Sequence, residues 1–197
     1  MRHNPYKIVK MFEETMADYC GSKYAVSLNS CTNALFLACK WIGIDNKEVI
    51  IPIIHAGGTV KFRDYRWKGI YQLEPYPIYD AAKRLTSGMY IPDTFMCLSF
   101  HIKKHLKIGK GGMILCNDPE AAAWFKARRY EGRTDGMKYH EDMITEEGWN
   151  MYMTPQQAAR GLTLMQNYPE HVEDIPEHPP YRDLTEFEIF KGIPVLK

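Results

Sequence analysis

The chain of 197 residues carries 25 basic and 24 acidic side chains, which gives a formal net charge of +1 at pH 7. Hydrophobic residues make up 45% and charged residues 25% of the sequence, a composition typical of folded proteins that excludes disorder as the default. The balanced charge excludes a global attraction to nucleic acid or anionic lipid, and the length favours one domain with at most an appendage.

The cysteines and the N-terminal stretch indicate the compartment. Five cysteines are scattered without C-x-x-C spacing, which fits neither a zinc ribbon nor a disulfide framework. We therefore expect reduced, mostly buried thiols and no metal site. The first 15 residues lack the apolar core of a secretory signal, and no stretch approaches a membrane span. These observations predict a cytoplasmic protein without a nucleic-acid or membrane partner.

The first 54 residues alternate between helical and strand patterns. Ser30 or Thr32 is a suitable opening residue for the second helix, and Gly43 is a suitable closing residue. The order of strand, polar turn and helix predicts an α/β fold. The predicted elements are a helix over 4–20 with Gly21 as its stop signal, a strand over 23–29, a helix over 30–43 and a strand over 48–54.

Short strands dominate the middle of the chain, and two helices follow. The strands are predicted over 69–74, 76–82, 96–101 and 111–118. The helices are predicted over 118–132, capped by Asp118, and over 154–168, capped by Thr154. The basic stretch 126–133 is interpreted as the outer face of the first of these helices. From Pro169 onward the chain is rich in proline and acid, so we expect it to wrap around the body or trail from it.

The turn "NSCTNAL" over 29–35 lies between a buried strand and a helix. The free N–H groups and the positive dipole end of that helix suit a phosphate. Alternatively, Ser30 and Thr32 only cap the helix, as most helices need caps and few bind phosphate. Both interpretations stay open from these residues alone.

Asp80 and the lysine-rich turn after residue 99 are further candidates. Asp80 ends a short apolar strand, where an ionised carboxylate needs a positive partner. That partner is either an arginine or lysine of the protein or a protonated ligand nitrogen. Ser99 and Lys104 are close enough in sequence to reach one pocket, and a lysine near other cations has a depressed pKa that favours Schiff-base chemistry. A solvated turn is the alternative for each lysine.

Read in order, these segments resemble the DegT-type sugar aminotransferases, pyridoxal-phosphate enzymes of the aspartate aminotransferase fold (fold type I). The resemblance covers Phe12 to about Gln166 and is carried by "KYAVSLNSCTNALFLACKWIGI", "DAA", "SFHIKKHLKIGKGGMILCND" and "GWNMYMTPQQAARGL". It implies a three-layer sandwich with a mixed, mostly parallel central sheet, as in a reduced large domain of such enzymes.

The resemblance assigns roles to three residues around the lysine turn. Lys104, not Lys103, matches the lysine that forms a Schiff base with pyridoxal 5′-phosphate. Ser99, at the head of the same motif, is implied as a phosphate contact. Asp80 matches the aspartate that forms a salt bridge to the protonated pyridine nitrogen.

Three further residues complete the implied site. Thr32 and Asn33 match phosphate contacts at the helix N-terminus. Asn150 matches an asparagine that reaches the cofactor phosphate of the neighbouring subunit, which implies a homodimer with shared sites.

The implied activity is transfer of an amino group from glutamate to a nucleotide-linked keto-sugar, with Lys104 moving the proton. Two alternatives stay open: a cofactor-binding protein with altered or lost transaminase activity, and a non-catalytic interaction protein that keeps the shell of the fold.

The sequence departs from the family pattern at several positions. Cys31 stands for the glycine of the phosphate turn, and Lys83 stands for a glutamine after "DAA". The aromatic residue that stacks on the cofactor ring would fall near His55 or Ala56. His55 is therefore interpreted either as a ring partner or as an ordinary polar histidine at a strand end.

Length is the largest departure from the family. Only the 27 residues 53–79 separate Pro52 from Asp80, and the family's C-terminal small domain is missing. We therefore expect a compact cofactor-binding domain over 1–168 with an internal deletion, and an extension over 169–197. A compact natural enzyme, such as a phage-encoded one, and a decayed paralogue both fit this expectation.

Overall fold

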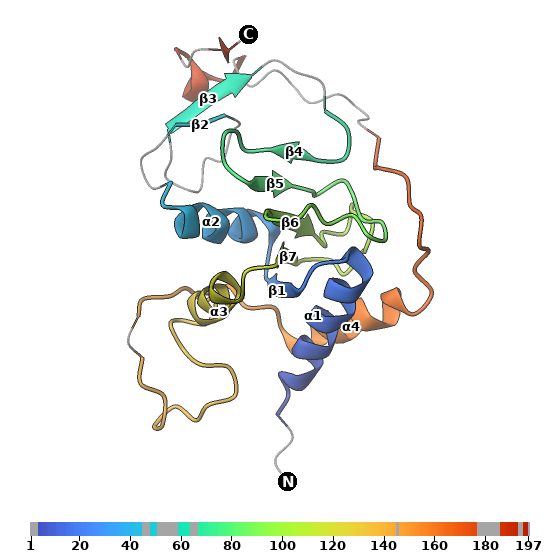
Figure 1. Cartoon of the computed structure of the whole chain (residues 1–197), viewed down its shortest axis with the longest axis vertical. Coiled ribbons are helices and arrows are strands. Elements are labelled where there is room, and N and C mark those ends of the chain that lie inside the picture. Colours follow the sequence, from blue (N-terminus) through green and yellow to red (C-terminus); the bar gives the residue numbers. More distant parts are fainter. Residues whose placement is uncertain are drawn as a thin grey trace.

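A mixed five-stranded sheet forms the centre of the protein (Figure 1), as seen in a computed structural model. Its strand order is β1-β7-β6-β5-β4. The strands are β1 (Tyr24–Leu28), β4 (Tyr71–Gln72), β5 (Ile78–Asp80), β6 (Phe95–Ser99) and β7 (Gly112–Cys116). The structure describes residues 4–44, 48–50, 59–63, 67–144, 146–176, 186–192 and 195–196.

The sheet is mixed, as predicted, but its pairings are mostly antiparallel. Strands β1, β6 and β5 run in one direction, while β7 and β4 run in the other. Among the described strands of this sheet, only β5 and β6 therefore form a parallel pair. The predicted "mostly parallel" character holds for strand direction but is wrong for hydrogen-bonded pairs, because β7 lies between β1 and β6.

Four helices cover the two faces of the sheet and confirm the three-layer α/β architecture. Helices α2 (Cys31–Ile42) and α3 (Pro119–Arg128) lie on one face, and α1 (Lys7–Cys20) and α4 (Pro155–Met165) lie on the other. Successive strand residues alternate between the two cores, as a pleated strand requires. In β1, for example, Ala25 packs toward α1 and Val26 toward α2.

The helix boundaries follow local capping signals. Ser30, rather than Thr32, caps α2, since its Oγ accepts a hydrogen bond of 3.1 Å from the Asn33 N–H. Asp118 caps α3, and Thr154 caps α4 in a capping box with Gln157. These three caps confirm the predicted starting points.

A second, three-stranded parallel sheet consists of β2 (Glu48–Ile50), β3 (Thr59–Arg63) and β8 (Val195–Leu196). The predicted strand over 48–54 is confirmed for its first three residues, and the rest of it lies outside the described residues. A short 3₁₀ helix, η2 (Glu188–Phe190), precedes β8 in the chain.

The segment that follows α4 wraps along the body, which confirms one of the two predicted alternatives for residues 169–176. Its backbone bonds to the loop after β5: the Ser87 N–H donates to the Glu170 carbonyl at 2.9 Å, and the Ile175 N–H donates to the Lys83 carbonyl at 2.9 Å. Arg84 forms a two-pronged ion pair with Asp174, with hydrogen bonds of 2.8 and 2.6 Å. The segment therefore lies against the loop that leads away from Asp80.

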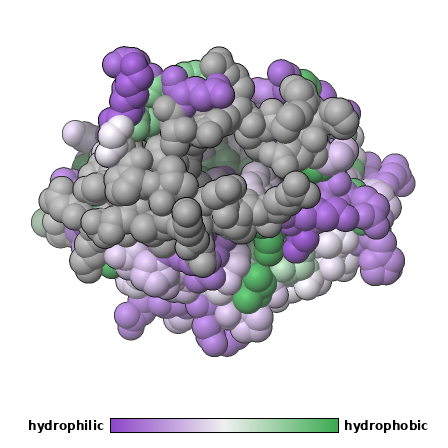
Figure 2. Space-filling model, turned by 90° about the horizontal axis from the view of Figure 1, so that it is seen from above, coloured by the Kyte–Doolittle hydropathy of each residue, from purple (hydrophilic) through white to green (hydrophobic). Residues whose placement is uncertain are grey.

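No described helix is long and apolar enough to cross a bilayer. On the face shown in Figure 2, hydrophilic side chains predominate among the coloured atoms, and hydrophobic ones form separate small patches.

Candidate functional site

The candidate site lies where strands β5 and β6 end beside the start of α2. Asp80 is the last residue of β5, and Ser99 is the last residue of β6. Because these strands are parallel neighbours, their carboxyl ends meet at the same edge of the sheet. Cys31, the first residue of α2, donates its thiol hydrogen to the Cys97 carbonyl of β6 at 3.7 Å. Strand ends and helix start thus face one another.

Lys104 and Lys103 differ in their environment although they are neighbours in the turn after β6. Lys103 is exposed, whereas Lys104 is partly buried. The charge of Lys104 acts on both Asp80 and Cys31 and lowers the pKa of each against the larger effect of burial. Lys104 is therefore the lysine that faces the site.

Asp80 is held by two hydrogen-bond donors. The Tyr71 hydroxyl donates to Oδ2 at 2.7 Å, and the Ala82 N–H donates to Oδ1 at 2.8 Å. Burial raises the pKa of the Asp80 carboxyl above its usual range, and these bonds and the charge of Lys104 hold back part of the rise. Within the described part of the chain, no ion pair to Asp80 is formed. The sequence predicted either an ion pair with an arginine or lysine of the protein or a protonated ligand nitrogen as the partner of Asp80. The second of these alternatives therefore stays a prediction.

The start of α2 presents backbone donors to the same place. The Asn33 N–H bonds to Ser30 Oγ and the Ala34 N–H bonds to the Ser30 carbonyl. The N–H groups of Cys31 and Thr32 belong to the first turn and have no acceptor within the helix. Such donors at a helix N-terminus suit an anion.

Gly112 allows α2 to start this close to the sheet. A Cβ at Gly112 would overlap the Ser30 carbonyl group and the Cys31 nitrogen. The glycine pair at the start of β7 was visible in the sequence, but nothing in the sequence alone indicated which backbone approaches it. Gly112 and Tyr71 are the two site residues that sequence reasoning missed.

Other predicted residues take different positions. The Ser99 hydroxyl accepts a weak hydrogen bond from the His101 N–H at 3.5 Å. The Asn33 side chain donates to Asn29 Oδ1 at 2.6 Å, within the same turn. The Thr32 side chain is exposed.

The side chain of Asn150 bonds to a residue outside this cluster. It is exposed, and its amide donates to Glu131 Oε1 at 3.0 Å. His55 lies outside the described residues. Lys83 places its ammonium group 5.1 Å from the centre of the Trp67 ring. Its charge is thus balanced in part by an aromatic face.

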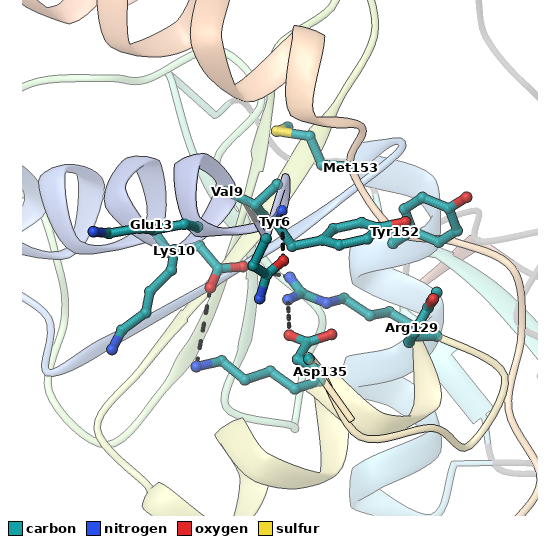
Figure 3. A pocket seen from close by; sticks show the side chains of 13 residues that line it. Tyr6, Val9, Lys10, Glu13, Arg129, Asp135, Tyr152 and Met153 are labelled. Atoms are coloured by element: carbon teal, nitrogen blue, oxygen red, sulfur yellow. Dashed lines mark hydrogen bonds and ion pairs between the residues drawn. The ribbon is translucent and has the colours of Figure 1, made fainter. Parts of the chain in front are cut away.

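A separate cavity of about 410 Å³ opens between α1 and the end of α3 (Figure 3). Glu13, with 5% of its surface exposed, pairs there with Arg129, which is 2% exposed. Arg129 also bonds to Asp135 at 3.0 Å and to the Ser27 carbonyl at 2.6 Å. The sequence predicted that the basic stretch 126–133 forms the outer face of a helix. For Arg129 this prediction is wrong, because Arg129 is buried in an ion pair with Glu13. Arg129 is thus paired with Glu13 and Asp135 at this cavity, and these charges do not call for a ligand.

Three tyrosines line the mouth of this cavity, and Figure 3 shows Tyr6 and Tyr152 close to Arg129. The ring centres of Tyr6 lie 5.9 Å from those of both Tyr130 and Tyr152. Burial, with smaller contributions from these two neighbours, raises the pKa of Tyr6 to about 12. Tyr6 therefore stays uncharged at neutral pH.

Comparison with known proteins places the chain in a family. A family model for the DegT/DnrJ/EryC1/StrS aminotransferase family matches residues 2–61 and 88–178. GDP-perosamine synthase of Caulobacter vibrioides is 27% identical over 84% of this chain and 58% of its own length. Spore coat polysaccharide biosynthesis protein SpsC of Bacillus subtilis is 28% identical over 78% of this chain and 55% of its own length.

Solved structures share the fold. AtS13 from Actinomadura melliaura superposes with a TM-score of 0.67 at 19% identity, over 82% of this chain and 60% of that protein. Helicobacter pylori PseC, an aminotransferase involved in the biosynthesis of pseudoaminic acid, gives a TM-score of 0.64 at 18% identity, over 86% of this chain and 64% of its own. The chain thus spans somewhat more than half the length of the relatives that it matches.

Proposed function

Because the chain belongs to the DegT/DnrJ/EryC1/StrS aminotransferase family, we propose that it binds pyridoxal 5′-phosphate beside Lys104 and transfers an amino group to a nucleotide-linked keto-sugar. The observation that carries this proposal is that the charge of Lys104 acts on the partly buried, hydrogen-bonded Asp80 next to the start of α2. Asp80 falls in the interval 62–87 that the family model leaves unmatched, so its role rests on this geometry.

The residues present fit the cofactor in charge and in hydrogen-bonding capacity. Asp80 has an acceptor lone pair left on each carboxylate oxygen for a protonated ring nitrogen. The first-turn N–H groups of Cys31 and Thr32 suit the phosphate. Asn33 follows them in α2, and Ser99 ends the neighbouring part of the site at β6. Gly112 keeps that helix start against the sheet. When bound, pyridoxal phosphate supplies an electron-accepting ring that stabilises negative charge on the carbon next to the substrate nitrogen.

The protein's own groups then divide the work. Asp80 would hold a proton on the ring nitrogen by its negative charge. Lys104 would supply the amine that holds the cofactor, and its free amine would move a proton at the substrate carbon. Cys31 supplies a backbone donor, while its thiol occupies space toward Cys97 that a glycine would leave open.

The substrate class comes from the relatives. One relative is named GDP-perosamine synthase, and another from Campylobacter jejuni is named UDP-4-amino-4,6-dideoxy-N-acetyl-beta-L-altrosamine transaminase. We extend a nucleotide-linked keto-sugar substrate to this chain from those names, with glutamate as the amino donor.

The proposal includes a homodimer in the cytoplasm. Asn150 is exposed and held by Glu131, which leaves its second amide hydrogen and carbonyl available to the cofactor phosphate of a second copy. Large apolar side chains are exposed on the neighbouring loop, which favours a covered surface: Met137, Tyr139, Met143 and Ile144. The five cysteines are free thiols, as expected in a reducing compartment.

The domain division is part of the same proposal. Residues 1–168 would hold the cofactor, and 169–197 would form an extension. The contacts of residues 169–176 along the loop after Asp80 support an extension that lies against the cofactor domain rather than apart from it.

The test is a two-stage reaction with the purified chain. The protein is loaded with pyridoxal phosphate, desalted and mixed with glutamate, and conversion of the cofactor to its amino form is followed by absorbance. A panel of nucleotide-linked keto-sugars is then added, and amino-sugar products are identified by mass spectrometry. Cofactor binding without either conversion would support the altered-activity alternative, and absence of cofactor binding would support the interaction-protein alternative.

A further inference from the structure

Tyr71 and Asp80 lie directly opposite each other on the antiparallel strands β4 and β5. Their side chains therefore project from the same face of the sheet. The hydroxyl of Tyr71 donates to Oδ2 of Asp80 at 2.7 Å, while Oδ1 accepts from the Ala82 N–H at 2.8 Å. The carboxylate is thus fixed at both oxygens.

The ring of Tyr71 is itself held in place. Its centre lies 4.8 Å from that of Trp67, with the two rings inclined at 67°. The ammonium group of Lys83 in turn lies over Trp67, at 5.1 Å from the ring centre. Since the tyrosine is packed on a neighbour, its hydroxyl is an oriented donor and not a rotating one.

Other ionisable groups face Asp80 from the surrounding elements. They are Lys104 from the turn after β6, Cys31 from the start of α2 and Cys97 from β6. Burial raises the pKa of Asp80, and the hydrogen bond from Tyr71 is the largest of the influences that oppose this rise. A donor to the charged form favours ionisation of a carboxyl group.

We propose that Tyr71 is a positioning residue for Asp80. The Tyr71 hydroxyl keeps the Asp80 carboxylate ionised and turned toward the ring nitrogen of the cofactor. The identity of that ligand rests on the proposed function, whereas the coupling between Tyr71 and Asp80 belongs to the chain itself. The family model does not match residues 62–87, which include Tyr71 and Asp80. The match therefore does not describe the pairing of β4 with β5 that brings these two side chains together.

The test compares Tyr71→Phe with Tyr79→Phe. Phenylalanine keeps the ring against Trp67 and removes only the hydroxyl. Tyr79 lies on the same hairpin, but its hydroxyl donates to Gln72 Oε1 at 3.1 Å and does not bond to Asp80.

Carbon-13 NMR of aspartate carboxyl groups, in the full chain without cofactor, follows the titration of Asp80, and Asp80→Asn identifies its signal. We expect the pKa of Asp80 to rise in Tyr71→Phe and to stay at the wild-type value in Tyr79→Phe. An unchanged Asp80 titration in Tyr71→Phe overturns the inference.

A second measurement uses pyridoxal phosphate itself. Loss of a hydrogen bond to a charged group predicts about tenfold weaker binding by Tyr71→Phe, with Tyr79→Phe binding like wild type. Equal binding by all three proteins overturns the positioning role. If wild type binds no cofactor, the proposed function fails, and the carboxyl titration still decides whether Tyr71 controls Asp80.

Discussion

Glu13 and Arg129, 116 positions apart in the chain, form an ion pair that is almost fully buried between α1 and the end of α3. Oε1 of Glu13 also accepts from the N–H and hydroxyl of Ser27 in β1. The pair therefore joins the first helix, the first strand and the chain after α3. Strand β1 in turn leads into the turn that starts α2.

Removal of Arg129 should destabilise the protein strongly. Arg129→Ala would leave Glu13 buried without its main partner, and breaking a buried pair in this way costs about 3–5 kcal/mol. Arg133→Ala is the control, because Arg133 pairs with Glu131 at 3.5 Å with both side chains about one-third exposed. Such a pair contributes about 0–1 kcal/mol. Urea unfolding measures both free energies, and similar values for the two variants would contradict a stabilising role for the buried pair.

The ionised Asp80 side chain should lower the free energy of unfolding at neutral pH. Because burial raises the folded-state pKa of Asp80 above 3.8, its favourable contribution is fully present only below the unfolded pKa and is lost as pH rises through the folded pKa. We expect Asp80→Asn to unfold at higher urea concentration than wild type at pH 7. The difference should shrink as the pH falls toward 3.8. A variant that is less stable than wild type at pH 7 would show that Asp80 is already compensated in the free protein.

Gly112 should be needed for the anion site rather than for strand formation. In Gly112→Ala the added methyl group meets the backbone of Ser30 and Cys31, so α2 must shift, at about 1–3 kcal/mol. Gly43→Ala is the control: it meets open space and is strained only by its φ of 75°. Only Gly112→Ala should move the amide NMR signals of residues 31–33 and weaken cofactor binding. If both variants leave those signals unchanged, the close approach of β7 to α2 is not required.

The parts of the fold that the sequence predicted are those governed by local chemistry. Ser30, Asp118 and Thr154 each cap a helix within three residues of themselves, so their roles could be recognised in the sequence. The choice of Lys104 came from resemblance to a family motif and stays a prediction; in the structure Lys104 is partly buried and Lys103 is exposed.

The parts that the sequence did not predict depend on contacts across long separations or on short pairings. Arg129 was predicted to lie on the surface because its ion-pair partner, Glu13, is 116 positions away in the first helix. A pairing over such a separation cannot be recognised in the sequence. Tyr71 gains its role only from a two-residue strand that pairs with β5, a pattern too short for periodicity to indicate. Mostly antiparallel pairing was also missed, since strand order does not follow from the sequence of strands along the chain.

The central claim is that Lys104 is the group that bonds to pyridoxal phosphate. The direct measurement is borohydride reduction of the cofactor-loaded chain, followed by peptide mass spectrometry, for wild type, Lys104→Ala and Lys103→Ala. We predict a stable cofactor adduct on the peptide that contains Lys104 in wild type and in Lys103→Ala, and none in Lys104→Ala. An adduct on Lys103, or an adduct that persists at this turn in Lys104→Ala, would contradict the claim.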